Sequence, residues 1–431
     1  MNLPREAIAT VSLVDQYCAA YQHLFPEVRS FECFKFLHLG MISEIKRKSL
    51  PAIARAVGLE NSQPLHHFLA NSPWDVQAIR DMRIQLLKLA LKKREFIVCI
   101  DETGDKKKGK TTDYVARQYI GNLGKTENGI VSVNAYGILD GITFPLIFKI
   151  FKPKSRLKAK EIYKTKPQLA IEIIKELKEI GFNFKIVLAD SLYGESGDFI
   201  EVLNHHQLNF IVAIRSNHSV LMPQGWRVRY TIWKKFDRVF SHGDTEVRYI
   251  REIVFGKRRS IRYWQITTDN VELPENSTWF IMTNLPGNIQ KSVGNTYGLR
   301  TWIEYGFKQV KDELGWADYR LTDYSEIEKW WEVVCSAYMM ISLQSIPFKE
   351  LDKKVRRNQK ELEAKFSQHR WWDEGQSWKN VLNNLRLIIQ PYIFFCLINP
   401  WLKVFEIPIL KQGFLALISI MNEFNAYVPD G

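Results

Sequence analysis

Residues 96–101 read Phe96-Ile-Val-Cys-Ile-Asp101, an apolar run that is followed by a carboxylate. A second run, Phe184-Lys-Ile-Val-Leu-Ala189, is followed in the same way by Asp190. Short apolar runs of this kind are typical of strands that are buried on both faces of a sheet. Open sheets place their chemistry at the ends of such strands. The two runs therefore predict an α/β fold in which two buried strands each end in an aspartate.

The segments around these runs predict the rest of the sheet and the helices that cover it. Asp140-Gly141 separates two strand-like segments and is a dipeptide typical of tight hairpin turns. The elements after the first run are expected in the order strand, strand, helix, strand, helix, strand, at residues 130–139, 143–151, 160–180, 184–189, 197–207 and 209–214. Three antiparallel strands followed by alternating helices and strands are the element order of an RNase H-like fold.

A third carboxylate lies among basic and aromatic residues in Tyr297-Gly-Leu-Arg300-Thr-Trp-Ile-Glu304-Tyr-Gly-Phe-Lys-Gln-Val-Lys311. Tyr297, Arg300, Glu304 and Lys311 are separated by three, four and seven residues, which predicts that they share one face of one helix. Together with the two strand-end aspartates, Glu304 would hold two Mg²⁺ ions about 3.5 to 4 Å apart, the arrangement used in phosphodiester displacement. The other three side chains would bind phosphates on either side of the cut.

These residues resemble the DDE transposases of bacterial insertion sequences, in the branch named for its Tyr-Arg-Glu-Lys signature. The resemblance covers most of the chain and rests on four stretches, Asp101-Glu-Thr-Gly104, Val115-Ala-Arg117-Gln-Tyr119, Ala189-Asp-Ser-Leu-Tyr193-Gly194 and Tyr297 to Lys311. It implies an enzyme that cuts the inverted-repeat ends of its own element and joins the freed 3′-hydroxyl groups to target DNA. Mg²⁺ is the expected cofactor, with Mn²⁺ as a substitute.

The resemblance also assigns roles to individual residues. Asp101, Asp190 and Glu304 would be the catalytic metal ligands. Tyr193 would contact the DNA backbone or only close its turn. The same two alternatives, a DNA contact or a local structural role, remain open for Arg117. The resemblance further implies self-association in a synaptic complex and a bacterial, cytoplasmic protein associated with the nucleoid.

A segment rich in Trp, Tyr, Val and Arg separates the last of these strands, 209–214, from the third acid, and we interpret residues 218–290 as an inserted β-rich domain. In transposases that resemble this chain, an insertion at this place packs over the active site, and a Trp on its last strand can stack on a flipped base. Trp279 occupies the corresponding place. Such stacking stabilises an unpaired base by about 1–3 kcal/mol. The alternative is that Trp279 is an ordinary core aromatic.

Helical regions are expected on both sides of the catalytic core. Ser49 to Leu59 and Ser62 to Ala70 favour a helix-turn-helix that reads the transposon end, with a plain helical hairpin as the alternative. Residues 349–365 predict a solvated helix, and the apolar C-terminal region would serve dimerisation or cover the core. The predicted domains are 1–95 (helical, DNA-binding), 96–217 (first part of the core), 218–290 (inserted), 291–345 (core helix with Glu304) and 346–431 (C-terminal helical region).

The composition limits the function classes that remain. Sixty Lys and Arg against 47 Asp and Glu give a net charge of +13, which favours a polyanionic partner such as double-stranded DNA. The five cysteines have no Cys-x2-Cys spacing, which argues against a zinc site or a disulfide framework. The longest apolar tract, 385–402, is interrupted by Arg386, Pro391 and Pro400, so we predict a buried helix and no membrane partner.

Two alternative functions stay open at this level. Gly104 to Thr111, which contains Lys110, fits the P-loop pattern G-x4-G-K-[ST] of ATPases. Against that reading, Asp101, Glu102 and Asp105 would surround a triphosphate with negative charge. The second alternative is a domesticated relative that binds DNA but has no transposition activity.

Overall fold

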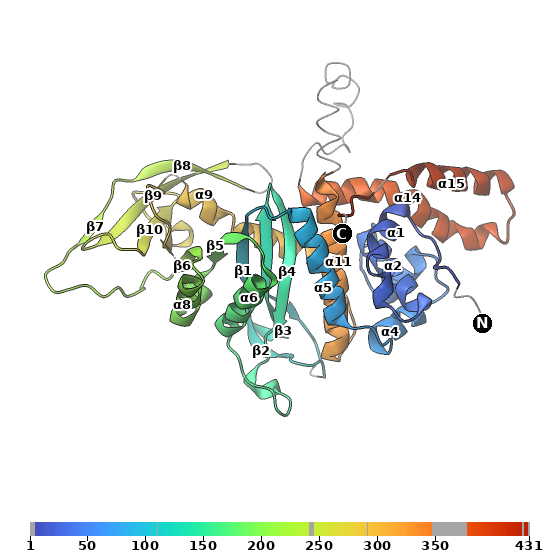
Figure 1. Ribbon diagram of the computed structural model, residues 1–431, viewed down its shortest axis with the longest axis horizontal. Coiled ribbons are helices and arrows are strands. Elements are labelled where there is room, and N and C mark those ends of the chain that lie inside the picture. The colour runs from blue at the N-terminus through green and yellow to red at the C-terminus, as the bar shows by residue number, and fades with distance from the viewer. Residues whose placement is uncertain are drawn as a thin grey trace, which may run out of the picture. The chain divides into compact units, whose positions relative to one another are not determined.

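The computed structural model describes residues 5–109, 111–240, 245–290, 292–346, 377–424 and 426–429. The chain forms two compact units (Figure 1). The sheet unit comprises Lys93–Lys110 and Tyr114–Phe307. The helical unit comprises Met1–Lys92, Thr111–Asp113 and Lys308–Gly431.

One mixed sheet of 11 strands organises the sheet unit, in the order β2-β3-β1-β5-β6-β11-β10-β9-β7, with β4 paired to β3 and β8 paired to β9. The strands are β1 (Phe96–Lys106), β2 (Ala116–Ile120), β3 (Lys125–Leu139), β4 (Ile142–Ile150), β5 (Phe184–Ala189), β6 (Asn209–Ile214), β7 (Val228–Tyr230), β8 (Lys234–Val239), β9 (Thr245–Phe255), β10 (Arg262–Thr267) and β11 (Trp279–Thr283). The helices are α6 (Lys166–Ile180), α7 (Ser191–Gly194), α8 (Gly197–His205), α9 (Val293–Gly298) and the first part of α10 (Thr301–Asp312). The expected mixed α/β architecture is confirmed and is consistent with an RNase H-like core.

Local sequence signals explain where these elements begin and turn. The β3–β4 hairpin turns at Asp140 and Gly141, whose φ angles of 52° and 78° are both positive, as a type I′ turn requires. Helix α6 begins at Lys166, later than expected, because Thr165 caps it: the Thr165 hydroxyl accepts from the Gln168 amide, and the Gln168 side chain accepts from the Thr165 amide.

The strands from residues 218–290 continue the same sheet as the core. Strand β11 pairs antiparallel with β6, with Ile281 opposite Ala213, and β10 pairs with the other edge of β11. Strands β9, β8 and β7 follow outward from β10. Hydrogen bonds therefore join this segment to the core. That residues 218–290 form a separate domain stays a prediction.

The prediction of a single helix from Tyr297 to Lys311 was wrong. Helix α9 ends at Gly298 and α10 begins at Thr301, so Arg300 lies in the turn between them. The Arg300 amide bonds to the Tyr297 carbonyl, a tight i to i−3 contact, and the Thr301 hydroxyl donates to the Gly298 carbonyl at 2.8 Å. In a continuous helix, the carbonyls of Tyr297 and Gly298 would accept from amides four residues later. Here they accept within the turn, so α9 ends before α10 begins.

The helical unit contains α1 (Ser12–Ala19), α2 (Val28–Ile42), α3 (Leu50–Ala56), α4 (Gln63–Ala70), α5 (Val76–Leu91), α11 (Tyr324–Leu343), α14 (Trp378–Leu402) and α15 (Pro408–Met421). Both helices of the proposed helix-turn-helix, α3 and α4, are present. Gly58 has a φ of 79° just after α3, a conformation that glycine adopts without strain. Helix α11 is buried over most of its length and packs against α2 and α5.

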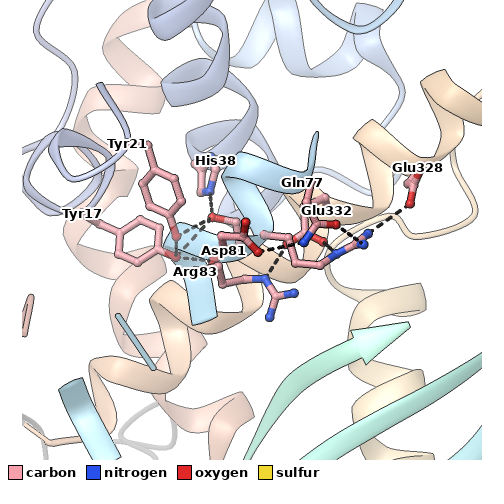
Figure 2. A network of polar contacts seen from close by, with 10 residues as sticks. Tyr17, Tyr21, His38, Gln77, Asp81, Arg83, Glu328 and Glu332 are labelled. Atoms are coloured by element: carbon pink, nitrogen blue, oxygen red, sulfur yellow. Dashed lines mark hydrogen bonds and ion pairs between the residues drawn. The ribbon is translucent and has the colours of Figure 1, made fainter. Parts of the chain in front are cut away.

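A buried ion network connects α5 to α11 in this unit (Figure 2). Glu332 has no exposed side-chain surface and accepts from Nε of Arg83 at 2.5 Å and from Nε of Arg80 at 3.0 Å. Although burial opposes its ionisation, the two guanidinium groups lower the pKa of Glu332. Next to this network, the ring of His38 contacts the hydroxyl of Ser336 on α11 at 2.8 Å. Polar contacts therefore tie three helices together inside an otherwise apolar core.

The C-terminal helices α14 and α15 are adjacent and form a hairpin (Figure 1). Leu385, Ile389 and Ile393 on α14 are buried, but other apolar side chains of α14 are exposed, so the tract 385–402 is only partly the buried helix that was expected. By length and composition alone, α14 would also suffice to cross a membrane, a test that core helices of soluble proteins pass as well. The predicted solvated helix at 349–365 falls outside the described residues.

Candidate metal and DNA site

Parallel pairing of two strands brings Asp101 and Asp190 together. Strands β1 and β5 pair in parallel up to Ile100 opposite Ala189, so the next residue of each strand is an aspartate at the same level of the sheet. Strand β1 continues to Lys106 beside β3, whereas the chain after β5 turns into α7. Asp190 caps that helix, because its Oδ1 accepts from the Leu192 amide at 2.9 Å.

A third carboxylate, Glu102, joins this pair. Ligand atoms of Asp101, Glu102 and Asp190 all lie within 4.8 Å of one another. Opposite oxygen ligands of Mg²⁺ are about 4.2 Å apart, twice the Mg–O distance of about 2.1 Å, so small side-chain rotations suffice to close the group on an ion. Oxygen donors from carboxylates are also the ligands that such hard cations prefer. The three residues therefore fit a divalent cation.

Glu102 is held by two partners on the side of α6 and α7. Its Oε1 lies 2.9 Å from Nζ of Lys166, and its Oε2 accepts from the Tyr193 hydroxyl at 2.9 Å. Tyr193 is fully buried, so in this structure its hydroxyl orients Glu102 and presents no surface to a DNA backbone. Glu102 was not among the predicted ligands, although its position directly after Asp101 was the available signal.

Arg300 connects Asp101 to Glu304. Its Nη1 lies 3.0 Å from Oδ2 of Asp101, and its Nη2 lies 2.8 Å from Oε1 of Glu304. The Glu304 side chain is 52% exposed, and it is not part of the compact acidic group found among the described residues. Glu304 thus lies beside the site through an ion pair, and its role as a metal ligand stays a prediction.

Crowding of charge in a buried place changes the ionisation of these groups. Burial, followed by the repulsion from neighbouring carboxylates, raises the pKa of both Asp101 and Asp190, although Arg300 works in the opposite direction. Burial opposes the charge of Arg300, but Tyr297, Asp101 and Glu304 raise the pKa of its guanidinium. The acids repel one another in the absence of a cation, and Arg300 offsets part of that repulsion.

A cavity of about 990 Å³ lies beside these acids in the sheet unit. It is lined by Asp190, Tyr297, Arg300 and Glu304 from the elements described above, and by Trp279 at the start of β11. The structure therefore brings Trp279 into one cavity with residues of the predicted signature. Tyr297 is nearly buried there, and burial raises the pKa of its hydroxyl.

Two predicted DNA contacts are not among the residues that line this cavity. Arg117 is exposed on strand β2, which is separated from β1 by β3 in the order of the sheet. Lys311 belongs to the last turn of α10, in the part of that helix assigned to the helical unit. Their roles stay predictions.

The P-loop alternative was wrong. Gly104, Asp105 and Lys106 belong to strand β1 and pair with Val131, Ile130 and Gly129 of β3, so they do not form a phosphate-binding loop. Residues 111–115 form a turn that leads into strand β2, where a P-loop would require the start of a helix. Lys110 itself lies outside the described residues.

Comparison with known proteins shows which families this chain is similar to. A family model described as DDE superfamily endonuclease matches residues 23–230, and a model described as Transposase DDE domain matches residues 164–340. A protein of Microchaete diplosiphon described as "Probable transposase for insertion sequence element IS701" is 58% identical over 329 residues. That alignment covers 76% of this chain and 87% of the relative.

Proposed function

Because this chain belongs to the DDE-superfamily transposases of the IS701 type, we propose that Asp101 and Asp190 hold the divalent metal with which it cuts and transfers DNA. The observation that carries the proposal is the parallel pairing of β1 with β5, which ends where both aspartates begin. The raised pKa values of the two aspartates support it, since a bound cation would stabilise carboxylates whose ionisation burial and mutual repulsion oppose.

We assign Mg²⁺ to this site, with Mn²⁺ as a substitute. We also propose two further metal ligands, one that binds the metal before DNA arrives and one that joins after DNA is bound. Glu102 already lies within reach of both aspartates and completes the site in the free protein. Glu304 joins when a DNA phosphate takes the guanidinium of Arg300, which now holds Glu304 at 2.8 Å. Bound metal ions would activate water or a 3′-hydroxyl and stabilise the leaving oxygen during phosphodiester displacement.

The remaining side chains orient the DNA. Arg300 and Tyr297 line the cavity beside the acids and are proposed to bind the phosphates next to the cut, with Lys311 binding a phosphate further along. Tyr193 is proposed to orient Glu102 through its hydroxyl, in place of the DNA contact that was predicted. Arg117 is a candidate backbone contact because it is exposed on β2.

The proposed substrates are the inverted-repeat ends of the element that encodes the protein, and target DNA. The net charge of +13 supports a polyanionic partner. Helices α3 and α4 are joined through residues 57–62, which include Gly58 with its positive φ, and we propose that they read the terminal repeat. The protein would act in the cytoplasm, on the DNA of the nucleoid.

We further propose that the chain self-associates through the hairpin of α14 and α15. Leu387, Phe394, Leu397 and Trp401 are exposed at intervals of seven, three and four residues, which places them on one face of α14. No residue of α15 is buried, although the helix is predominantly apolar. The exposed apolar side chains from residue 387 to residue 420 offer on the order of 1,000 Å², which exceeds the roughly 800 Å² per partner of a standard interface. A second copy of the chain is the occupant to which we assign this face.

Strand cleavage tests the proposed function directly. The substrate is a labelled duplex that carries the terminal repeat of the element, incubated with the full-length protein in Mg²⁺ or in EDTA. We expect nicking at the repeat boundary that requires the metal and is lost in Asp190→Asn. The matched control is Asp198→Asn, an aspartate in the first turn of α8, which should cut like wild type. Binding without cleavage by wild type in Mg²⁺ and in Mn²⁺ would overturn the proposal and favour a domesticated DNA-binding protein.

A further inference from the structure

Two arginines of the β8–β9 hairpin lie in the same cavity as the acids. Arg238 pairs with Glu246 across the hairpin, and Arg248 is two residues further along β9, so both arginines and Glu246 point to the same face. Arg238 and Arg248 are 6% and 5% exposed, and both line the cavity of about 990 Å³. Nearly complete burial of two like charges is uncommon without a nearby anion.

The charges of this pair are only partly balanced. Arg248 forms an ion pair with Glu246, since its Nη2 lies 2.7 Å and its Nε 2.9 Å from Oε2 of Glu246. The Nε of Arg238 is buried and has no hydrogen-bond partner among the residues that the structure describes. Burial, and then the charge of Arg248, lowers the pKa of Arg238. A second anion near Arg238 would therefore satisfy both its charge and its free donor.

Trp279 holds the two guanidinium groups in place. The Cζ atom of Arg248 lies 4.1 Å from the centroid of the Trp279 ring, and Cζ of Arg238 lies 5.2 Å from it. Arg238 also lies 4.8 Å from the ring of Phe240. A guanidinium group stacked on an aromatic ring keeps the N–H donors at its own edge free to bind a phosphate in a bidentate way. Trp279 thus acts on the arginines as a positioning residue.

The end of α9, just before the turn that carries Arg300, packs against Arg238. A Cβ atom at Gly298 would lie 3.4 Å from Nε of Arg238, at the near end of ordinary van der Waals contact. Arg238 therefore lies directly beside the end of α9, two residues before Arg300. A DNA strand held at Arg300 would pass this second cationic group within the same cavity.

We propose that Arg238 and Arg248, held on the ring of Trp279, bind a second phosphate of the DNA strand that occupies the cavity. This inference rests on the proposed function, since it names a further contact to the same substrate. It differs from base stacking on Trp279, because the arginines, and not a base, are the groups in contact with the ring.

Salt-dependent binding of the terminal-repeat duplex to the full-length protein in EDTA tests this inference without cleavage. We expect Arg238→Gln to weaken binding about tenfold and to reduce the slope of log K against log salt by about 1, because one phosphate contact is lost. Arg238→Lys keeps the charge and should keep most of the slope. The matched control is Arg251→Gln, on the same strand as Arg248 and stacked on Tyr230 and Trp233 at 4.2 and 4.3 Å. It should retain the wild-type slope.

Single neutral methylphosphonate linkages placed along the cleaved strand locate the phosphate. At one position, the neutral linkage should weaken DNA binding by wild type yet have little further effect on binding by Arg238→Gln. An unchanged salt slope in a folded Arg238→Gln variant, or an equal loss in Arg251→Gln, would overturn the inference. Failure of wild type to cut in any metal would instead overturn the proposed function, and the two results are read in separate assays.

Discussion

The guanidinium of Arg300 lies 3.0 Å from the carboxylate of Asp101, so a cation of the protein itself occupies one side of the proposed metal site. The other end of Arg300 holds Glu304. Arg300 therefore does two things: it offsets the repulsion among the acids, and it forms an ion pair with Glu304, the third predicted ligand. Both effects lead to measurable consequences.

Removal of the Arg300 charge should strengthen metal binding and weaken catalysis. Arg300→Gln is expected to raise the affinity for Mn²⁺ about tenfold in the absence of DNA, because a positive charge next to Asp101 is lost. Cleavage should fall at least 100-fold, since the phosphate loses its partner. Titration calorimetry with Mn²⁺ and the cleavage assay measure the two effects. Arg215→Gln, which removes an exposed arginine paired with Glu195, is the control. Unchanged Mn²⁺ affinity in Arg300→Gln would contradict this account.

The two glutamates should separate binding of metal from cutting of DNA. Glu102→Gln is expected to weaken Mn²⁺ binding at least tenfold without DNA, because Glu102 lies within the compact acidic group. Glu304→Gln should leave that affinity nearly unchanged and abolish cleavage. Tyr193→Phe, which removes the hydroxyl that orients Glu102, should weaken Mn²⁺ binding several-fold. Calorimetry and the cleavage assay on the same preparations test all three variants. Full cleavage by Glu304→Gln would remove it from the proposed ligands.

The buried ion network in the helical unit should dominate the stability of that unit. Glu332→Gln removes the carboxylate shared by Arg83 and Arg80 and leaves two buried guanidinium groups without it. We expect a loss of about 3–5 kcal/mol in the free energy of unfolding, as for other broken buried pairs. Glu328→Gln removes a more exposed partner of Arg80 and should cost at most about 1 kcal/mol. Urea denaturation compares the two, and equal losses would show that burial of Glu332 is not the cause.

Because His38 is buried, we expect the free energy of unfolding to fall in mild acid. This residue is fully buried, and burial lowers its pKa from 6.5 to about 4. Between these values the unfolded chain binds more protons than the folded protein, so stability is complete above about pH 6.5 and falls as the pH drops toward 4. From pH 7.5 to pH 5 the contribution of this residue falls by about 2 kcal/mol. The difference between wild type and His38→Gln in urea denaturation at both pH values isolates the effect, and identical pH dependence would refute it.

Charges on the exposed face of α15 should dissociate the protein. Wild type is expected to sediment as a dimer at micromolar concentration, and Leu417→Asp combined with Ile420→Asp as a monomer, because the interface would bury two unpaired carboxylates. Val271→Asp alters an even more exposed apolar residue of the sheet unit and should leave the dimer intact. A monomeric wild type would exclude this face as a site of self-association.

Local sequence signals determined much of the architecture. Apolar runs predicted β5 and β6 with the bounds that are observed, and Asp140-Gly141 predicted the hairpin between β3 and β4. The helix that begins at Leu50 and the turn at Gly58 were also readable, because turns depend on residues close in sequence. The Ser49 side chain makes no capping hydrogen bond. The two aspartates were recognisable for a related reason, since each directly follows an apolar run.

Only the tertiary structure decided how these pieces combine. Helical periodicity predicted that Tyr297, Arg300 and Glu304 share one helix. In the structure a turn separates α9 from α10, and Gly298 at the end of α9 packs against Arg238, a distant contact that sequence spacing cannot reveal. Glu102 follows Asp101 in a strand, where alternation sends neighbouring side chains to opposite faces, and only the arrangement at the end of β5 brings their carboxylates together with Asp190. Periodicity and capping act over a few residues, but the site is made by strand pairing and ion pairs between distant segments, which the folded chain alone specifies.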